Sequence, residues 1–301
     1  MFKKIIIIVL LLIFYRGSAD AGPKIAVVQS VRVKPYEQAV NGFRSVCGAD
    51  VERIVISELN GTDVIRKIYA GRYNMVLAIG GNALSITKGI KKVPVVYLMV
   101  LNPLLFISEQ RNIFGVGMNI PPQKQLHIFL KVLPRIKNIG VLYNPKMTGR
   151  LVESARDAAQ KAGLTLTLKK IFNSKNVPLS IEEMKEKIDA FWMMPDLTVI
   201  TPETVEFLLL FSLRNRIPIL TFSEKYVALG AVISVGIDAV DIGRQAGEVT
   251  NEILSGPSES DRPEIRHVNP RKAAVSINLK TAKKLGLHID KDIMKNARIL
   301  H

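Results

Sequence analysis

The stretch AFWMMPDLTVITPETVEFLLLFSLRNR, residues 190–216, indicates the fold class of the chain. Residues 190–194 are a short apolar run, as expected of a strand buried on both faces of a sheet. Pro195 has no N–H to donate to a strand ladder, so the strand should end there. A largely buried apolar helix should begin after Thr201, which is followed by a proline and an acid. This succession predicts an α/β unit in a parallel sheet.

Asp196 directly follows this strand and is the first candidate functional residue. In an open α/β sheet, ligands bind in the crevice outside the carboxyl ends of the strands. A carboxylate at that edge is therefore a candidate ligand contact. The alternative is a loop aspartate whose side chain caps the following turn. The residues alone leave both roles open.

The same alternation of apolar strands and helices runs along the whole chain. We expect strands at residues 25–28, 51–56, 75–79, 95–101 and 113–118, then at 139–143, 164–171, 190–194, 217–220 and 231–235, and late strands at 264–268 and 273–279. One of the intervening helices should open on a capping box formed by Ser180 and Glu183. Two successive series of about five strands predict two similar α/β lobes with parallel sheets and right-handed crossovers.

The N-terminus has the pattern of a secretory signal peptide. Two lysines precede a continuous apolar run at residues 5–14, and a small-residue cleavage site follows at residues 19–21. The apolar run is too short to span a membrane. We expect cleavage after Ala21 and a periplasmic location, although Arg16 is unusual in this region. An uncleaved anchor is the alternative.

Composition narrows the class of protein. The 301 residues are 48% hydrophobic and carry a formal net charge of +16. This hydrophobic fraction supports sizeable cores and argues against disorder. Lysine and arginine are scattered, which favours a solvated basic surface; attraction to anionic lipids or anionic ligands is the alternative. Zinc-finger spacing, basic-region heptads and an aromatic RNA-binding signature are absent from the sequence, so we expect no nucleic-acid partner.

Motifs that carry catalysis or hold a cofactor are absent from the sequence. The glycines at Gly115 and Gly117 do not continue into a dinucleotide fingerprint, and neither a P-loop nor a G-x-S-x-G elbow occurs. The four histidines lack metal-ligand spacing. We therefore expect no catalytic residue, no metal and no cofactor. Cys47 is the single cysteine, so we expect no disulfide; on the apolar side of a predicted helix it should be a buried, inert thiol. With no cysteine near the cleavage site, we expect no lipid anchor there.

Polar loops follow the predicted strands instead. They offer hydrogen-bonding groups without a nucleophile–base pair, which suits binding better than catalysis. The backbone N–H groups after Gly80, where a helix opens, could hold a carboxylate. Each such residue by itself is more often a turn residue. The candidate ligand-binding residues are Gln29, Gly81, Asn82, Asn102, Tyr143, Asn144, Asp196 and Ser223.

At these loops the chain resembles the ABC transporter substrate-binding proteins whose better-known members bind aromatic amino acids. The resemblance covers about residues 24–287 and rests on many pieces in order, among them IAVVQ, AIGGNA, VYLMVLNP, IKNIGVLYNP, MMPDLTV and IPILTFSEKYVALGAVISVGID. It implies a type I periplasmic-binding-protein fold, in which two Rossmann-like lobes joined by hinge crossovers close on a ligand. It also implies delivery of the ligand to the membrane permease of an ABC transporter. In family members, polar residues matching Gln29, Asn82, Asn144 and Asp196 approach the charged ends of the ligand.

Together with the two strand–helix series, the resemblance implies a division of the chain. Residues 1–21 are the signal peptide, residues 22–118 with about 239–270 form lobe 1, and residues 119–238 with part of 271–301 form lobe 2. The chain should cross between lobes near residue 119 and again near Asp238. A cleft between two such lobes is a usual place for a small-molecule site.

The chain departs from the family pattern at three places. Asn102 stands where an aspartate is usual before proline, Leu197 follows the aspartate where an asparagine is common, and Arg150 with its neighbour Gly149 replaces small hydroxyl residues. Recognition of a ligand ammonium group is therefore open, and Arg150 could favour a more acidic ligand. An amino acid or a related small carboxylate is the ligand we expect.

Three hypotheses for function follow. The first is a monomeric, non-catalytic transport receptor, and the second is a periplasmic sensor or partner-binding module that signals to a membrane protein through the same cleft. An exported α/β enzyme is the third, and the missing nucleophile–base motif argues against it. If Asp196 contacts the ligand, Asp196→Asn should weaken binding and spare the fold. If it is a turn residue, the same change should lower the melting temperature and spare affinity.

Overall fold

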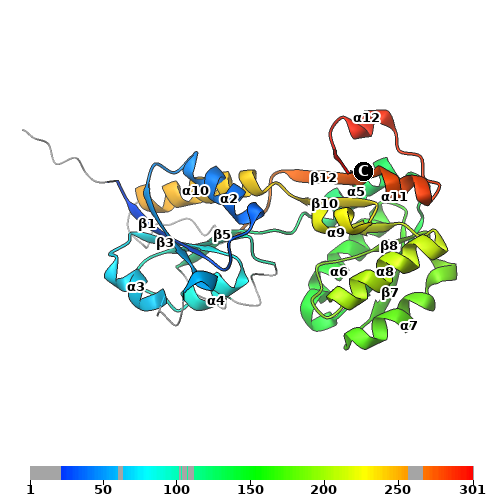
Figure 1. Ribbon diagram of the computed structural model, residues 1–301, viewed down its shortest axis with the longest axis horizontal. Helices are drawn as coiled ribbons and strands as arrows, with labels where there is room; N and C mark the ends of the chain where they lie inside the picture. The colour runs from blue at the N-terminus through cyan, green and yellow to red at the C-terminus, as the bar shows by residue number, and fades with distance from the viewer. Residues whose placement is uncertain are drawn as a thin grey trace, which may run out of the picture.

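The computed structural model describes residues 22–59, 64–101, 103, 107, 112–256 and 267–300. It contains two α/β lobes that lie side by side along the long axis of the molecule (Figure 1). We call the part built on a six-stranded sheet lobe 1 and the part built on a seven-stranded sheet lobe 2. The predicted signal peptide, Asn102 and the predicted loop at residues 259–263 lie outside the described residues.

The sheet of lobe 1 is parallel, with the strand order β11-β5-β4-β3-β1-β2. Its strands are β1 (Lys24–Gln29), β2 (Asp50–Val55), β3 (Met75–Ile79), β4 (Val95–Leu98), β5 (Ile113–Val116) and β11 (His267–Val268). Its helices are α2 (Lys34–Arg44), α3 (Val64–Ala70), α4 (Gly81–Thr87) and α10 (Ala239–Ser255). Apolar residues of α2 and α10 pack on one face of the sheet, and those of α3 and α4 pack on the other.

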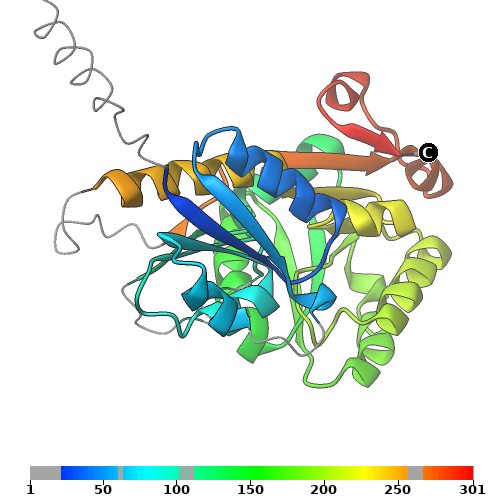
Figure 2. The same ribbon diagram turned by 60° about the vertical axis from the view of Figure 1, so that its left-hand side comes forward.

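Helix α10 lies in lobe 1, and glycines let it approach α2 closely. A Cβ atom on Gly243 would overlap the carbonyl oxygen of Ala39, and one on Gly42 would overlap that of Val240. Figure 2 shows the two helices, α2 in blue and α10 in gold, side by side on lobe 1. Residues 239–255 therefore pack against the sheet of lobe 1, although they follow strand β10 of lobe 2 in the sequence.

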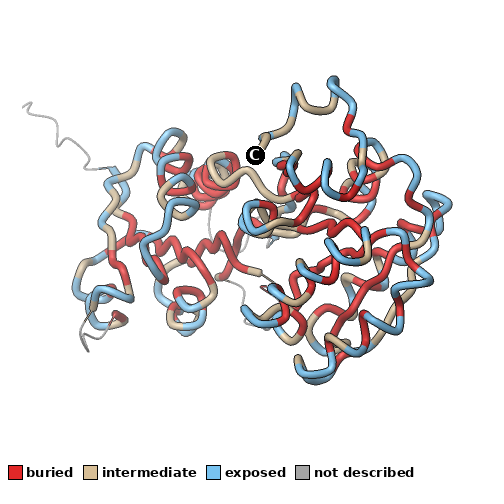
Figure 3. The backbone as a smooth tube through the Cα atoms, turned by 45° about the vertical axis from the view of Figure 1, so that its right-hand side comes forward, coloured by how far each residue is buried: buried red, intermediate tan, exposed pale blue. Residues whose placement is uncertain are grey.

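The sheet of lobe 2 has the strand order β13-β12-β10-β9-β8-β6-β7. Its strands are β6 (Asn138–Tyr143), β7 (Thr165–Lys170), β8 (Ala190–Trp192), β9 (Ile219–Thr221), β10 (Ile233–Ile237), β12 (Ala273–Asn278) and β13 (Arg298–Leu300). Its helices are α5 (Pro122–Val132), α6 (Pro145–Lys161), α7 (Val177–Glu182), α8 (Pro202–Asn215), α9 (Glu224–Leu229), α11 (Leu279–Lys284) and α12 (Lys291–Met294). Figure 3 shows buried residues gathered in the interior of each lobe, with exposed residues around them.

The stretch at residues 190–216 forms the predicted strand and helix. Strand β8 is fully buried, with Phe191 and Trp192 in the apolar clusters on opposite faces of the sheet. The predicted helix start is confirmed, because the Thr201 side chain accepts a hydrogen bond from the backbone N–H of Thr204 at the N-terminus of α8. The expectation that α8 is largely buried is wrong, since one face is exposed and includes Leu210, which is 46% exposed.

Three other local predictions need correction. The capping box at Ser180 is wrong, because α7 begins at Val177 and Ser180 is buried inside it. Strand β12 runs antiparallel to β10, so the second sheet is mixed rather than parallel. Cys47 lies beyond the end of α2 rather than within it, but it is buried, as predicted, and burial raises the pKa of its thiol.

The chain crosses between the lobes three times, at residues 117–121, at Asp238 and at residues 269–272. The first crossing leaves the carboxyl end of β5, and the second leaves the carboxyl end of β10. Because these strands run parallel to their neighbours, the carboxyl edges of the two sheets face each other across the crossings. This geometry brings the loops that follow the strands into one region.

Candidate functional site

Gln29 ends β1 at the carboxyl edge of lobe 1 and is fully buried. Its Nε2 donates to Glu37 Oε1 at 3.3 Å, whereas its Oε1 has no hydrogen-bond partner among the described residues. Glu37 also accepts a 2.7 Å bond from Arg53. Burial opposes ionisation of Glu37, but the hydrogen bonds from Arg53 and Gln29 outweigh it and hold the pKa of this carboxyl below its usual range. The Glu37 carboxylate thus holds the Nε2 group of Gln29, while the Oε1 atom stays available as a hydrogen-bond acceptor.

Gly80 connects the neighbouring strand β3 to α4. It has a φ of +91°, and a Cβ atom there would overlap the Tyr36 hydroxyl group, so only glycine suits this position. The Ser30 hydroxyl oxygen accepts the backbone N–H of Ala83 at 2.9 Å and so fixes the start of α4. Gly81 and Asn82 are the first two residues of this helix; Asn82 is exposed, and its side chain makes no hydrogen bond within the described residues.

Asp196 lies at the facing edge of lobe 2 and is fully buried. Its Oδ2 accepts from the backbone N–H of Asn144 at 2.7 Å and from the Thr148 hydroxyl at 2.5 Å. Its Oδ1 accepts from the backbone N–H groups of Thr198 at 2.9 Å and Val199 at 3.3 Å. A carboxylate has about four lone-pair sites, so these four donors saturate it. In this conformation Asp196 caps the turn after its strand and has no lone pair left for a ligand.

Asn144 is the N-cap of α6 and is tied to the same turn. Its Oδ1 accepts from the backbone N–H of Lys146 at 3.0 Å, and its Nδ2 donates to the Thr198 hydroxyl at 2.9 Å. The structure therefore brings Asn144 and Asp196 together, as their positions after neighbouring strands suggested. Tyr143 is buried in the apolar cluster of lobe 2, which gives it a packing role instead of an exposed contact.

Ser223 is the N-cap of α9 and lines a cavity of about 620 Å³ between the lobes, which we call the hinge cavity. The cavity receives residues of α2 and the end of β4 from lobe 1, and residues of β10, β12, β13 and the loop before α9 from lobe 2. The sequence analysis missed Tyr36, Met99 and Met118, which also line it. In the sequence these three residues fit the apolar patterns of a helix or a strand, which predict core residues and not residues that line a cavity.

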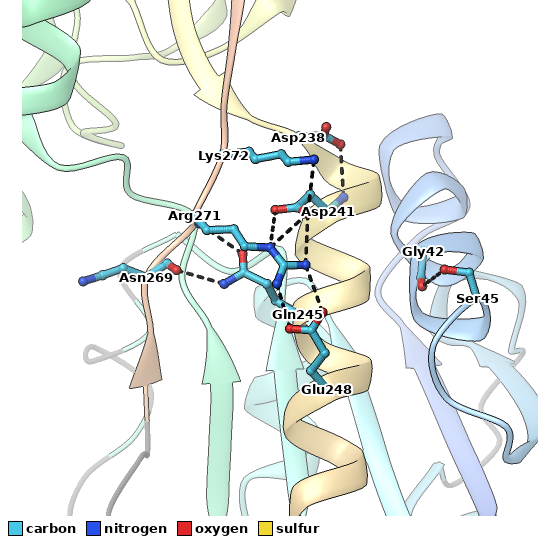
Figure 4. A network of polar contacts seen from close by, with 9 residues as sticks. All are labelled: Gly42, Ser45, Asp238, Asp241, Gln245, Glu248, Asn269, Arg271 and Lys272. Atoms are coloured by element: carbon cyan, nitrogen blue, oxygen red, sulfur yellow. Dashed lines mark hydrogen bonds and ion pairs between the residues drawn. The ribbon is translucent and has the colours of Figure 1, made fainter.

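The third crossing is fastened to lobe 1 by Arg271 (Figure 4). The guanidinium donates to both oxygens of Asp241 at 3.1 Å and to Glu248 at 2.8 and 3.0 Å, both residues of α10. The backbone N–H of Arg271 donates to Gln245 Oε1 at 3.2 Å. The backbone carbonyl of Arg271 accepts from the ammonium group of Lys124, in α5 of lobe 2, at 3.1 Å. This hinge clamp ties the third crossing to α10 with a charge-assisted network.

The arrangement provides hydrogen-bonding groups and an apolar cavity. Within the part of the chain that the structure describes, no group of three or more His, Cys, Asp or Glu side chains could hold a metal ion. Across the same ranges, no helix combines the length and apolar character needed to cross a membrane. Two α/β lobes with facing carboxyl edges and a cavity between them define a ligand-binding protein of the two-lobed class.

A match to a family model identifies the family within this class. The model described as "ABC transporter substrate binding protein" matches residues 49–300, and the chain belongs to that family. The family binds substrates and is not an enzyme family. The predicted fold class, two Rossmann-like lobes of a type I periplasmic binding protein, is confirmed by structural likeness.

Similar proteins include a tyrosine-binding protein from Clostridioides difficile, which is 27% identical over 209 residues. The match covers 66% of this chain and 60% of the relative, so it spans less than two thirds of that protein. A ligand-free, open substrate binding protein with adhesive properties from Clostridium difficile has a TM-score of 0.76 at 21% identity, covering 92% of this chain and 99% of that one. An ABC domain from Streptococcus pneumonia in complex with L-Trp has a TM-score of 0.66 at 22% identity, covering 93% and 100%.

Proposed function

We propose that this protein captures an amino acid or a related small carboxylate between its two lobes, as the substrate-binding component of an ABC importer. The observation that carries the proposal is that the carboxyl edges of both sheets face each other across a cavity lined by residues of both lobes. Ligand sites of α/β sheets lie outside such edges. A cavity of about 620 Å³ is also of the size that small-molecule sites have.

Candidate contacts differ between the lobes. In lobe 1, the unpartnered Gln29 Oε1 and the exposed Asn82 are available to a ligand's polar groups. In lobe 2, Ser223 lines the cavity, whereas Asp196 and Asn144 hold the loop that contains Thr198. The names of the relatives, which refer to tyrosine and L-Trp, support an amino acid as the ligand class.

Export, partners and domain division complete the proposal. Residues 1–21 act as a signal peptide, and the mature chain is a periplasmic monomer that delivers its ligand to a membrane permease. Its lobes comprise residues 22–118 with about 239–270, and residues 119–238 with part of 271–301. N-terminal sequencing of the exported protein should give Gly22 as the first residue; an intact Met1 in the membrane fraction would contradict this.

A thermal-shift screen of the 20 L-amino acids and small carboxylates tests the binding function. Ligand at 100 times its dissociation constant should stabilise the protein by about 2.7 kcal/mol. Small-angle scattering should then show a more compact particle, because a ligand that both lobes contact favours the closed state. No shift with any compound of the panel would contradict capture of this ligand class.

A further inference from the structure

Helix α8 keeps an exposed apolar face on the surface of lobe 2. Helices α7, α8 and α9 cover one face of the sheet, and their inward residues form one apolar cluster with it (Figure 1). The run FLLLFSL at residues 207–213 is apolar nearly all round, a pattern typical of a helix that is buried on every side. Leu210 and Leu213 are nevertheless 46% and 39% exposed. The helix therefore carries apolar surface that the described residues leave uncovered.

Exposed apolar side chains gather around this helix. Nine large apolar side chains are exposed in the described residues, and four of them lie on α7, α8 and α9: Leu179, Leu210, Leu213 and Leu229. A groove of about 490 Å³ runs between α8 and α9, and Leu209 and Leu229 line it from the two helices. Exposed apolar side chains that gather in one place mark an interaction surface, whereas scattered ones do not.

The outward face of α8 is acidic at one end and basic at the other. Residues three or four positions apart lie on the same face of a helix. One exposed stripe therefore contains Glu203, Glu206, Leu210, Leu213 and Arg214. Within the described ranges, neither Glu206 nor Arg214 forms an ion pair. The stripe thus presents a carboxylate before its leucines and a guanidinium after them, both without a charged partner in the described chain.

This stripe is complementary to itself. When two helices pack antiparallel about a two-fold axis at Leu210, positions equally far from Leu210 lie at the same height. Glu206 precedes Leu210 by four positions and Arg214 follows it by four, while Phe207 and Leu213 are each three positions away. Glu206 of one copy therefore lies level with Arg214 of the other, about 6 Å along the helix from the axis, at both ends of the contact. Apolar residues meet between these two charge pairs.

The balance of charge on the stripe favours a second copy over a membrane as the occupant. An anionic lipid surface attracts the arginine but repels Glu203 and Glu206, which lie on the same face. A second copy instead presents the opposite charge to each end. Residues 202–215 are absent from the lining of the hinge cavity, so a copy docked on α8 leaves that cavity open.

We propose that the outward face of α8 is a docking surface for a second copy of this chain, packed antiparallel with Leu210 at the two-fold axis. The contact goes beyond the proposed function, in which each copy captures its own ligand. One pair of 14-residue helices buries less than the roughly 1,200 Å² at which stable interfaces begin. The pairing is therefore reversible, and the chain is a monomer when dilute.

Sedimentation velocity of the full-length mature protein tests the contact. The apparent mass of the wild type should rise toward that of a dimer between about 1 µM and 1 mM protein, the range of weak dissociation constants. Leu210→Asp sets two carboxylates against each other at the axis and should weaken pairing by about 10-fold or more. Val31→Asp, at an exposed apolar position of lobe 1, is the control and should leave pairing unchanged. Melting curves check that the variants fold.

A charge exchange tests the antiparallel register. Glu206→Arg alone and Arg214→Glu alone each oppose like charges at both ends of the pair, so each should weaken pairing by about 10-fold. An equimolar mixture of these two variants should restore it, because every carboxylate again lies level with a guanidinium. This rescue depends on the two-fold arrangement and is not expected of a non-specific apolar contact.

Four results would overturn the proposal. A wild type that keeps the mass of a monomer up to about 1 mM excludes the contact. Pairing that survives Leu210→Asp places the contact on another surface, and single reversals without rescue in the mixture exclude the antiparallel register. Wild type that stays monomeric but binds phosphatidylglycerol vesicles, with binding lost in Leu210→Asp, assigns the face to a membrane. In each case ligand capture by the single chain stands, because it is measured separately by the thermal-shift screen.

Discussion

The carboxyl edges of the two lobes occupy equivalent places in similar sheets, yet their polar residues differ in how they are satisfied. At the edge of lobe 2, the Asp196 carboxylate accepts four internal hydrogen bonds, and the Asn144 side chain accepts one and donates one. At the edge of lobe 1, Gln29 leaves a buried oxygen without a partner in the described residues, and Asn82 is exposed. Asp196 and Asn144 therefore build their own loop, whereas Gln29 and Asn82 keep polar groups available; in lobe 2, Thr221 at the end of β9 also has a buried hydroxyl without a partner in the described residues.

This difference separates polar residues that hold a loop from polar residues that can bind a ligand. A buried acceptor without a partner costs about 1–3 kcal/mol, so each such group needs an explanation, and a ligand group that pairs with it is one. A buried carboxylate whose four lone-pair sites are filled is not available to a ligand, because any further partner must displace an existing donor. We therefore expect a substitution at Asp196 to lower the stability and spare ligand affinity. A substitution at Gln29 should lower ligand affinity and spare the stability.

Asp196→Asn should have the largest effect, and it should act on stability. Whichever way the amide is oriented, its NH₂ group faces a backbone N–H that now donates to the carboxylate, from Asn144 or from Thr198. Two facing donors in a buried site should cost about 2–4 kcal/mol. Urea unfolding measures the loss, and Asp157→Asn, at an exposed position of α6, is the matched control.

This expectation corresponds to the role of Asp196 as a residue that caps the following turn, which is the alternative to a ligand contact. Affinity, measured at a temperature where both proteins are folded, should change by less than about threefold, well under the tenfold that 1.4 kcal/mol represents. An unchanged stability together with a tenfold weaker ligand affinity would restore the role of Asp196 as a ligand contact and remove the contrast between the edges.

Gln29→Leu should show the reverse pattern. It removes the unpartnered oxygen and only one hydrogen bond, of 3.3 Å, so stability should change by no more than about 1 kcal/mol. Loss of an acceptor for a charged ligand group should weaken binding by about 10-fold or more. Titration and melting of this variant are compared with Gln160→Leu, an exposed position on α6. A large loss of stability with full affinity would assign Gln29 to the scaffold.

Arg271→Ala should have a smaller effect that is the same for every ligand. The substitution releases the third crossing from α10, although Lys272 remains 3.9 Å from the nearly buried Asp241. Because it acts on the equilibrium between open and closed states, affinity for all ligands should change by one common factor, about 2- to 10-fold. Titration with two ligands and scattering without ligand measure it, with Arg156→Ala, exposed on α6, as the control. Unequal factors would show that Arg271 acts at the site itself.

Glu37 should give the smallest effect, as a pH dependence of stability. Its folded-state pKa lies below the ordinary value of 4.5, so the contribution is present above that value and is lost as the pH falls through the lower folded pKa. The Glu37–Arg53 pair is partly exposed, so the contribution should be below about 1 kcal/mol. The stabilities of wild type and Glu37→Gln at pH 7 and below pH 4 should therefore converge at the lower pH. A constant difference would rule out this ionisation as the cause.

Patterns along the sequence predicted the elements well where burial alone decides them. Strand β3 has the predicted bounds, and the helix start at Thr201 has the predicted cap. The short-range signal at Ser180 failed because Asn176 and Val177 continue a 3-10 turn directly into α7, so the helix starts before the residue that resembles a cap. Periodicity also could not reveal that the last long strand, β12, runs antiparallel to its neighbour.

The sequence by itself determined two α/β series, strands buried on both faces, and polar residues placed just after those strands. These properties are local, because burial and capping depend on neighbours within a few positions. Only the tertiary structure decided that Asp196 accepts hydrogen bonds from Asn144 and Thr148, 52 and 48 positions away, and that small residues of β10 and β12 meet to leave a cavity beside Phe222. Which groups satisfy or exclude one another depends on contacts between distant segments, and a one-dimensional pattern does not record those contacts.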